Sequence, residues 1–414
     1  MRRRQLLRQT ALAGASSLVA LGAHGWAWRS EAQTSGNTAG TRMPRLVVVM
    51  LRGGIDGLNV VVPHQDLDYY EARPTIAIAK PGETNGALDL DGQFGLNPDL
   101  EPLMAQWQAG NLAFVQAAGS PVASRSHFQA QDYIETGTPG EASTSIGWLN
   151  RLLAFLPNGT PTTGLNVGSG GTLPLILSGP QTVANLKLTD QGSPPMAIDR
   201  PQLRTAFDQM YAGDDRIARV YQDGRTARDV LLTEVNNENM EASRGAPKPT
   251  RFARSTRRLA QLMKSDANTQ VAFMELGGWD SHVGERGILR RFLPLVGTGL
   301  ATLAQDLGPL YQDTVVVVMS EFGRTVLENG NAGTDHGHGN VIWLMGGGLR
   351  GQQVYGQWPG LDLSERYESR DLAVTTDYRD VLESVLRPHF GLDDQAIAQI
   401  FPNHQAQSRL ELLS

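Results

Sequence analysis

The chain of 414 residues contains no cysteine, 46 glycines and 22 prolines, and its formal net charge is −6. Without cysteine there can be no disulfide, thiolate zinc site, iron–sulfur cluster or cysteine nucleophile, so any metal must be held by histidine, carboxylate, amide or hydroxyl groups. The acidic balance argues against a nucleic-acid-binding protein, and the glycine and proline content favours many turns over a helical bundle.

The N-terminal segment is typical of an export signal. A basic head precedes a mildly apolar run rich in alanine and glycine, and a small-residue cleavage pattern ends at Ala32. Within the head, residues 3–8 read RRQLLR, which fits the twin-arginine pattern. We predict a twin-arginine signal peptide over 1–32 and a polar linker over 33–44, and hence a periplasmic protein with no membrane span after cleavage. An ordinary secretory signal or an uncleaved anchor is the alternative.

Residues 45–414 are expected to form a single domain in which apolar strands alternate with helices. Strands are predicted at 45–51, 111–119, 173–179, 268–278, 313–323 and 340–349, and helices at 99–108, 147–156, 286–307 and 375–391. Residues from about 200 to 265 are expected to form a helical insertion. Runs such as RLVVVML, apolar at nearly every position, are typical of strands buried on both faces. The pattern therefore predicts an α/β sandwich around a mostly parallel sheet.

Acidic and histidine side chains follow three of these strands. Asp56 lies after the first strand, Asp280 and His282 after the fourth, and Glu321 at the end of the fifth. Ligands of such sheets bind beyond the carboxyl ends of the strands, and this mixture of oxygen and nitrogen donors suits a divalent metal. Each carboxylate also has a structural alternative: a turn for Asp56, a helix N-cap for Asp280, and an ion pair with Arg324 for Glu321. Their convergence favours a site.

The segment TDHGHGN, residues 334–340, carries two further candidate ligands. His336 and His338 are two residues apart, and in extended backbone both side chains point to the same side. They precede the last predicted strand, however, so in a purely parallel sheet they would lie at the wrong edge. Either that strand is antiparallel, or the loop 324–339 reaches back over the sheet.

The segment SRSHF, residues 124–128, follows the second strand and opens a predicted helix. It places Ser124 and Ser126 beside Arg125 and His127. A hydroxyl at a helix N-terminus, close to a metal and an arginine, could attack an anionic ester. The alternative is a serine that merely caps the helix.

Four motifs together resemble the bacterial domain-of-unknown-function family 1501. They read LVVVMLRGGIDGLNVVVPHQDLDYYEARPTIAI, SRSHFQAQDYIETG, ELGGWDSH and SEFGRTVLENGNAGTDHGHGN, and the resemblance runs from about residue 43 to 390. That family is grouped with the alkaline phosphatase and sulfatase superfamily, so the resemblance implies an alkaline phosphatase-like α/β/α sandwich with a site for two divalent metals.

The resemblance also implies roles for individual residues. Asp56, Asp280 and His282 match metal ligands, and His336 or His338 matches the last histidine ligand, whereas Ser124 or Ser126 stands where the nucleophile is expected. In place of the superfamily's Asp-His pair the chain has Ser320-Glu321. An imidazole is thereby lost, so one ligand of the second metal has no counterpart in this sequence.

These observations lead us to expect an exported hydrolase of phosphate or sulfate esters that depends on one or two divalent metal ions (Zn, Ca, Mg or Mn). A serine would attack the ester, Arg125 or Arg324 would neutralise the developing charge, and the substrate would be a small anionic ester or glycan. The alternative is a catalytically degenerate relative that binds an anionic ligand or a protein partner without turnover. A third hypothesis is that the metal is purely structural and only holds the loops together.

Overall fold

The computed structural model describes residues 43–141, 144–157, 160–168, 173–187, 201–225 and 251–413. The expected signal peptide at 1–32 and most of the expected linker lie outside these residues. Among the helices of the described ranges, none combines the length and the apolar character that crossing a membrane requires.

A nine-stranded sheet forms the centre of the protein, in the order β11-β5-β10-β9-β1-β8-β6-β7, with β12 beside β5. Its strands are β1 (Arg45–Arg52), β5 (Leu112–Gly119), β6 (Gly164–Gly168), β7 (Ala184–Lys187), β8 (Val271–Gly277), β9 (Thr314–Met319), β10 (Asn340–Gly346), β11 (Gln353–Tyr355) and β12 (Thr376–Asp377). A second, three-stranded sheet joins β2 (Val61–Val62), β4 (Gly95–Leu96) and β3 (Leu88–Asp89). The central strands are the apolar runs, as expected for strands covered on both faces.

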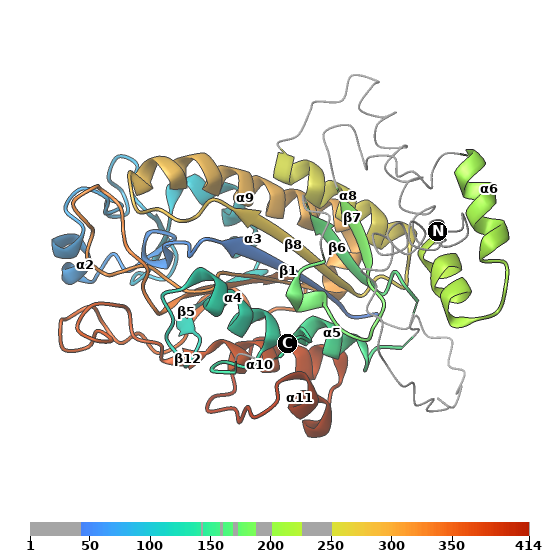
Figure 1. Cartoon of the computed structure of the whole chain (residues 1–414). Helices are drawn as coiled ribbons and strands as arrows, with labels where there is room; N and C mark the ends of the chain where they lie inside the picture. Colours follow the sequence, from blue (N-terminus) through green and yellow to red (C-terminus); the bar gives the residue numbers. More distant parts are fainter. Residues whose placement is uncertain are drawn as a thin grey trace, which may run out of the picture.

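Every pairing in the large sheet is parallel except those of β10, which runs antiparallel to both β5 and β9. The first residue of β10 therefore lies at the edge where β9 and β1 end. Of the two explanations for the position of His336 and His338, the antiparallel strand is the one observed, and the loop before it belongs to the carboxyl edge of the sheet (Figure 1).

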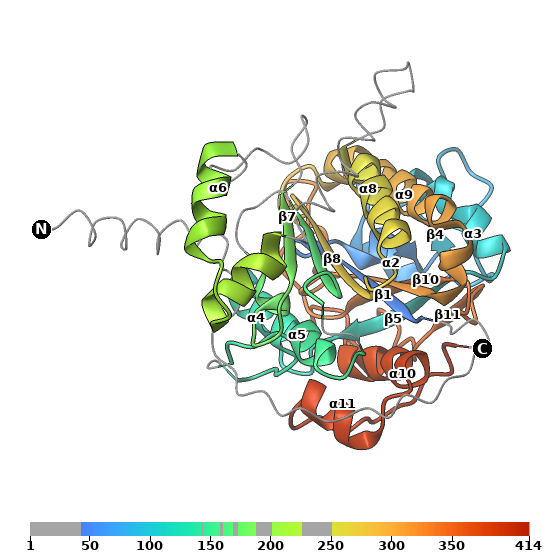
Figure 2. The same ribbon diagram turned by 90° about the vertical axis from the view of Figure 1, so that its right-hand side faces the viewer.

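Helices cover both faces of the sheet (Figure 2). One layer contains α3 (Met104–Gln108), α8 (Arg251–Ser265) and α9 (Glu285–Leu307); the other contains α4 (His127–Thr136), α5 (Trp148–Leu153), α10 (Tyr378–Phe390) and α11 (Asp394–Ile400). Alternate residues of β1 enter two different cores: Val47 and Val49 pack with α8 and α9, whereas Leu46 and Val48 pack with α10. The α/β/α sandwich around a mostly parallel sheet is thus confirmed.

The remaining elements are short. They are the α-helix α2 (Leu67–Ala72) and the 3-10 helices η1 (Gly57–Asn59), η2 (Pro98–Leu103), η3 (Leu175–Leu177) and η5 (Gly308–Asp313). The strand predicted at 173–179 is wrong, because its apolar residues form η3. Ile176 and Leu177 are buried against α4 and α5 there, and a short apolar run does not distinguish a strand from a helical turn.

The stretch expected to be a helical insertion is helical where it is described. Its helices are α6 (Pro201–Met210), the residues 216–225, and α8. Residues 226–250 lie outside the described ranges. Because α8 packs along α9 and contributes Leu259 and Met263 to the core, it belongs to the helical layer of the sandwich.

Candidate metal centre

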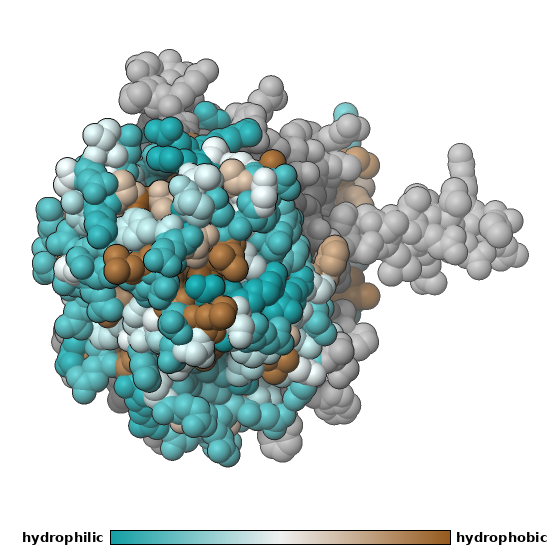
Figure 3. All heavy atoms as spheres, turned by 90° about the vertical axis from the view of Figure 1, so that its left-hand side faces the viewer, coloured by the Kyte–Doolittle hydropathy of each residue, from teal (hydrophilic) through white to brown (hydrophobic). Residues whose placement is uncertain are grey.

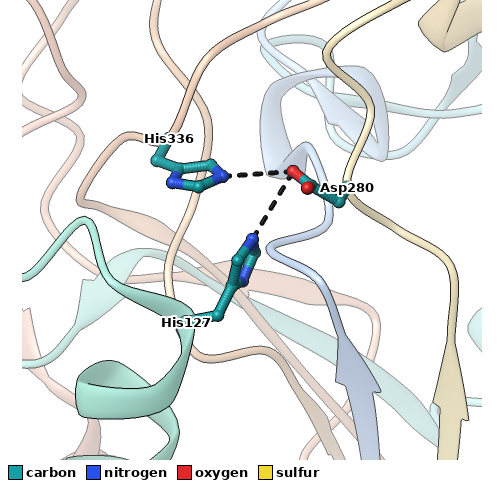
Figure 4. Close-up of side chains that lie close together, drawn as sticks. All are labelled: His127, Asp280 and His336. Atoms are coloured by element: carbon teal, nitrogen blue, oxygen red, sulfur yellow. Dashed lines mark hydrogen bonds and ion pairs between the residues drawn. The ribbon is translucent and has the colours of Figure 1, made fainter.

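Three segments from different parts of the chain bring four side chains together at the carboxyl edge of the sheet. The segment after β5 carries His127, the loop after β8 carries Asp280 and His282, and the loop between β9 and β10 carries His336. We call these four residues the histidine cluster. Figure 4 shows three of them, His127, Asp280 and His336, pointing toward one another.

The donor atoms of His127, Asp280 and His336 all lie within 4.8 Å of one another, and His282 lies close to two of these three residues. The Nε2 atoms of His282 and His336 lie 2.9 Å apart, and each is 3.1 Å from Oδ1 of Asp280. The Nε2 atom of His127 lies 3.5 Å from the same oxygen. It is buried and makes no hydrogen bond with any described residue. A buried ring nitrogen without a partner is costly unless something else occupies the space before it.

The Nδ1 atom of each imidazole, on the side of the ring away from the cluster, lies within hydrogen-bonding distance of an acceptor oxygen. Nδ1 of His127 lies 2.8 Å from Oε1 of Glu321, Nδ1 of His282 lies 2.9 Å from Oδ1 of Asp335, and Nδ1 of His336 lies 2.7 Å from the carbonyl oxygen of Arg125. These acceptors place the ring proton on Nδ1 and leave the lone pair of Nε2 facing the cluster. Metal-binding histidines in proteins are oriented in this way.

Close packing of the loops explains two of the glycines. Gly53 has a φ of +122°, and a Cβ there would lie 2.7 Å from the backbone nitrogen of Asp280. A Cβ at Gly333 would lie 2.4 Å from the backbone carbonyl carbon of His282. Only glycine allows these backbones to approach so closely, so both residues help to set the spacing of the histidine cluster.

Local electrostatics differ from one member of the histidine cluster to the next. The hydrogen bond to Glu321 raises the pKa of His127, whereas burial lowers the pKa of His336. For Asp280, burial acts to raise the pKa, but the hydrogen bond from Arg324 outweighs it and the net shift is downward. Asp280 is therefore anionic at neutral pH. The four side chains are 21% to 46% exposed, so the cluster is open to solvent.

The donor set fits a divalent transition metal. Three imidazoles and one carboxylate suit zinc and its neighbours, whereas calcium takes oxygen ligands only. A tetrahedron with metal–ligand bonds of about 2.0–2.1 Å has edges of about 3.3–3.4 Å. The separations of 2.9, 3.1 and 3.5 Å, each of which involves Asp280 or His336, lie on either side of that length.

Arg324 supports this edge of the sheet from within. Its buried guanidinium donates to the carbonyl oxygens of Gly53, Gly54, Trp279 and Thr334 and, over 2.6 Å, to Oδ1 of Asp280. The side chain thus fastens the loop after β1 to the two loops that bear ligands. Its contacts are those of a structural support rather than of a group facing an incoming anion.

Three of the residues predicted as metal ligands occupy other positions. Asp56 is fully buried and paired with Arg73, with Nη1 and Oδ2 2.5 Å apart. Glu321 lies behind His127 as its hydrogen-bond acceptor. His338 is buried, its Nε2 lies 2.8 Å from the carbonyl oxygen of Ser120, and its ring packs on Tyr367. The structure therefore brings Asp280, His282 and His336 together with His127, while Asp56, Glu321 and His338 stand outside that group.

The predicted nucleophile segment contributes differently from what was expected. Ser124 donates a hydrogen bond of 2.8 Å to Gln129, and Ser126 is the N-cap residue of α4 with an exposed side chain. The guanidinium of Arg125 pairs with Glu368 and Asp371, over 2.6 and 2.9 Å. His127, the first residue of α4, is the member of this segment that reaches the cluster. The sequence did contain a signal for it, namely an imidazole in the segment that follows a strand ending at the ligand-bearing edge.

The face that holds these loops is mixed in character. Figure 3 looks onto the side of the molecule where the strands end, and apolar groups stand there around small polar areas. Two exposed apolar residues follow cluster members directly in the sequence: Phe128, which is 85% exposed, and Val283, which is 65% exposed.

Three solved structures that a structural comparison finds similar to the chain share little sequence with it. One is a protein in the alkaline phosphatase superfamily from Vibrio parahaemolyticus, with a TM-score of 0.42 and 10% identity over 89% of this chain and 71% of that chain. Another is the C-terminal periplasmic domain of EcEptC from Escherichia coli in complex with Zn, with a TM-score of 0.39 and 11% identity over 90% of both chains. A third is the phosphonate monoester hydrolase SpPMH from Silicibacter pomeroyi, with a TM-score of 0.38 and 11% identity over 84% of this chain and 74% of that chain.

No curated protein matches the sequence significantly. Residues 43–401, by contrast, match the model of a family described as "Protein of unknown function (DUF1501)". This range covers most of the chain and includes every member of the histidine cluster. The chain therefore belongs to the DUF1501 family.

Proposed function

We propose that this protein is an exported, metal-dependent hydrolase of phosphate or sulfate esters. The observation that carries the proposal is the histidine cluster, in which three Nε2 atoms and Oδ1 of Asp280 converge while each Nδ1 is held by an acceptor. The ester class rests on the resemblance to the alkaline phosphatase and sulfatase superfamily. Export by the twin-arginine pathway to the periplasm rests on the N-terminal sequence.

In this proposal the four cluster residues hold one divalent ion. When bound, such an ion supplies Lewis-acid stabilisation of the charge that develops on an ester oxygen. Glu321 and Asp335 keep the lone pairs of His127 and His282 directed at the ion, and Arg324 keeps Asp280 anionic and oriented.

The nucleophile is a serine of the segment that carries His127. Ser126 precedes His127 directly and has an exposed side chain, which makes it the first choice over Ser124. Its hydroxyl oxygen would form a bond to phosphorus or sulfur as the alcohol of the substrate leaves with the proton. Water would then hydrolyse the resulting serine ester. Arg125 stands between the two serines in the sequence. Its guanidinium would neutralise the charge that develops on the ester during this attack.

A second function has its own support in the site. Ser124 is engaged with Gln129, Arg125 is paired with two carboxylates, and the guanidinium of Arg324 is buried among carbonyl groups. These contacts are what a degenerate relative would show, one that binds an anionic ligand or glycan at the metal without turning it over.

The two functions are separated by metal analysis followed by an activity assay on the same preparation. The exported protein would be analysed for bound metals, loaded with zinc, manganese, magnesium or calcium, and assayed with a panel of aryl phosphate and aryl sulfate esters. We expect one equivalent of a transition metal and turnover of one ester class, abolished in Ser126→Ala or, if Ser124 is the nucleophile, in Ser124→Ala. A metal-replete protein that turns over neither class would contradict the hydrolase and favour the ligand-binding function.

Two histidine variants control this experiment. His282→Ala removes a cluster member, whereas His389→Ala removes an imidazole on α10 that contacts the carbonyl oxygen of Arg45. Loss of bound metal in the first and its retention in the second is the expected pattern. Equal retention in both would remove the cluster as the metal site.

A further inference from the structure

A buried carboxyl group lies directly behind the two loops that carry most of the histidine cluster. Glu285 is the first residue of α9 and has no exposed surface. Its Oε2 accepts hydrogen bonds from the hydroxyls of Ser281, over 3.1 Å, and Thr334. Its Oε1 accepts a bond of 2.8 Å from the side-chain amide of Asn59.

The two hydroxyls belong to different ligand-bearing loops. Ser281 stands between Asp280 and His282 in the loop after β8. Thr334 directly precedes Asp335, the acceptor behind His282, and stands two residues before His336. One carboxyl oxygen therefore joins the segment that supplies two cluster members to the segment that supplies a third.

Backbone contacts connect the same two loops. The amide of Thr334 donates to the carbonyl oxygen of Ser281 over 3.1 Å, and the amide of Glu285 itself donates to that of Ala332 over 2.9 Å. The side-chain amide of Asn329 donates to the carbonyl oxygen of His282 over 3.0 Å. Glu285 therefore links these two hydrogen-bonded loops to the buried interior of the protein.

A further contact of Glu285 joins the two ligand-bearing loops to the segment after β1. Asn59 lies in η1 after β1, donates also to the carbonyl oxygen of Ile76, and accepts from the hydroxyl of Tyr69 over 2.5 Å. Nearby, Arg73 pairs with Asp56 and donates to the carbonyl oxygens of Thr325 and Val326 in the loop between β9 and β10. The carboxyl is thus held rigidly from one side while it holds the ligand loops on the other.

We propose that Glu285 is a positioning residue that fixes the spacing between the Asp280–His282 segment and the Asp335–His336 segment, and thereby sets the affinity of the site for a divalent cation. This inference rests on the metal site of the proposed function. Residues that orient metal ligands typically change metal affinity 10–100-fold when they are removed, although they never touch the ion.

The test compares cobalt(II) affinity and spectra in the full chain. Co²⁺ alone would be titrated into metal-free protein in competition with a chelator, and its visible absorption would report the ligand geometry. We expect Glu285→Ala to weaken Co²⁺ binding roughly 10–100-fold and to alter the absorption bands. Glu285→Gln, which can keep an acceptor oxygen toward Ser281 and Thr334, should bind within about threefold of the wild type if position is what matters.

Two further variants keep the test decisive. The double variant Ser281→Ala/Thr334→Val removes both hydroxyl contacts but retains Glu285, and should reproduce the loss of affinity even if Glu285→Ala does not fold. Asp380→Asn is the matched control. Asp380 is equally buried, in α10, where it accepts from the backbone amides of Gln407 and Ser408. This control should lower the melting temperature while leaving Co²⁺ affinity and spectrum unchanged.

The outcomes separate the two levels of inference. If the wild type binds no Co²⁺, the metal site itself fails and the role of Glu285 with it. If the wild type binds Co²⁺, and both the double variant and Glu285→Ala bind it with the affinity of the wild type, only the positioning role is overturned. A loss of affinity in Asp380→Asn as large as that in the double variant would likewise overturn it, because destabilisation alone would then explain the effect.

Discussion

Two groups of polar side chains lie at the same edge of the sheet, and they differ in how their charges are balanced. In the buried pair of Asp56 and Arg73, a carboxylate meets a guanidinium in two hydrogen bonds of 2.5 and 3.0 Å. In the histidine cluster, three ring nitrogens face a single carboxylate oxygen, and the Nε2 atom of His127 has no hydrogen bond to a described residue. Oδ1 of Asp280 accepts from Arg324, but the three ring nitrogens face that oxygen with lone pairs of their own. Such a set of electron-pair donors favours a bound ion, whereas a matched ion pair does not.

The comparison teaches that an acidic residue after a strand does not by itself indicate a ligand. Asp56 and Asp280 both follow buried strands, and both contact an arginine. Asp56 has no exposed surface, and its oxygens contact Arg73 and Glu285. Asp280 is half exposed, and one of its oxygens lies close to the imidazoles. The solvent exposure of the carboxylate and the presence of imidazole nitrogens beside it therefore distinguish a candidate metal ligand from the partner in a buried ion pair.

The largest effect is expected from breaking the buried pair. Asp56→Ala leaves the guanidinium of Arg73 buried without its partner, which should lower the free energy of unfolding by about 3–5 kcal/mol. Urea denaturation of the metal-free protein measures this loss. The double variant Asp56→Ala/Arg73→Leu should recover much of it. A folded Asp56→Ala protein of wild-type stability that has lost its metal would instead make Asp56 a ligand.

The next largest effect concerns the cluster residue that the sequence did not assign as a ligand. His127→Ala removes one of four donors and should weaken zinc binding about 100-fold or more, as measured by chelator competition, because each ligand carries a large share of the binding free energy. The stability of the metal-free protein should change little, since His127 is partly exposed. His338→Ala is the matched control, and equal zinc affinity of His127→Ala and the wild type would remove His127 from the site.

A smaller effect is expected from the acceptor behind His127. Glu321→Gln keeps the shape of the side chain but weakens the hydrogen bond that orients the ring, and should reduce zinc affinity roughly 10–100-fold. Retention of one bound metal at high zinc concentration would distinguish this role from that of a direct ligand. An affinity as low as that of His127→Ala would indicate that Glu321 binds the ion itself.

The smallest effect is expected in how the free energy of unfolding falls at acidic pH when Asp56 is replaced by Asn. Burial opposes ionisation of Asp56, but Arg73 outweighs it and holds the pKa of Asp56 below its ordinary value of 3.8. A depressed pKa stabilises the folded state above the unfolded value, and this contribution is lost as the pH falls through the folded value. Urea unfolding between pH 5 and pH 3 should therefore show a shallower decline for Asp56→Asn than for the wild type. Parallel curves would contradict the ionised pair.

Much of the fold follows from local patterns in the sequence. The runs that became β1, β5, β8, β9 and β10 are apolar over nearly every position, and the helices α9 and α10 carry buried apolar residues at helical spacing. The direction of β10 could not be derived in this way, because alternation and composition are the same in parallel and antiparallel strands. The direction of β10 nevertheless determines at which edge of the sheet His336 lies.

The site was predictable only in part for a related reason. Asp280, His282 and His336 lie in loops whose sequence already suggested ligands. That Asp56 would instead pair with Arg73 depends on a contact across 17 residues between a strand end and the end of α2, which no periodicity encodes. The choice of His127 over its neighbouring serines depends on how α4 begins, since one residue of shift at a helix start turns a different side chain toward the sheet edge.

Anomalous X-ray diffraction from zinc-loaded crystals, recorded at the zinc absorption edge, tests the metal centre most directly. We expect one strong peak bonded to the Nε2 atoms of His127, His282 and His336 and to the carboxylate of Asp280, with Glu321 and Asp335 behind the imidazoles. A fully loaded protein with no peak between these residues, or with its peak on Asp56 or His338, would contradict the assignment.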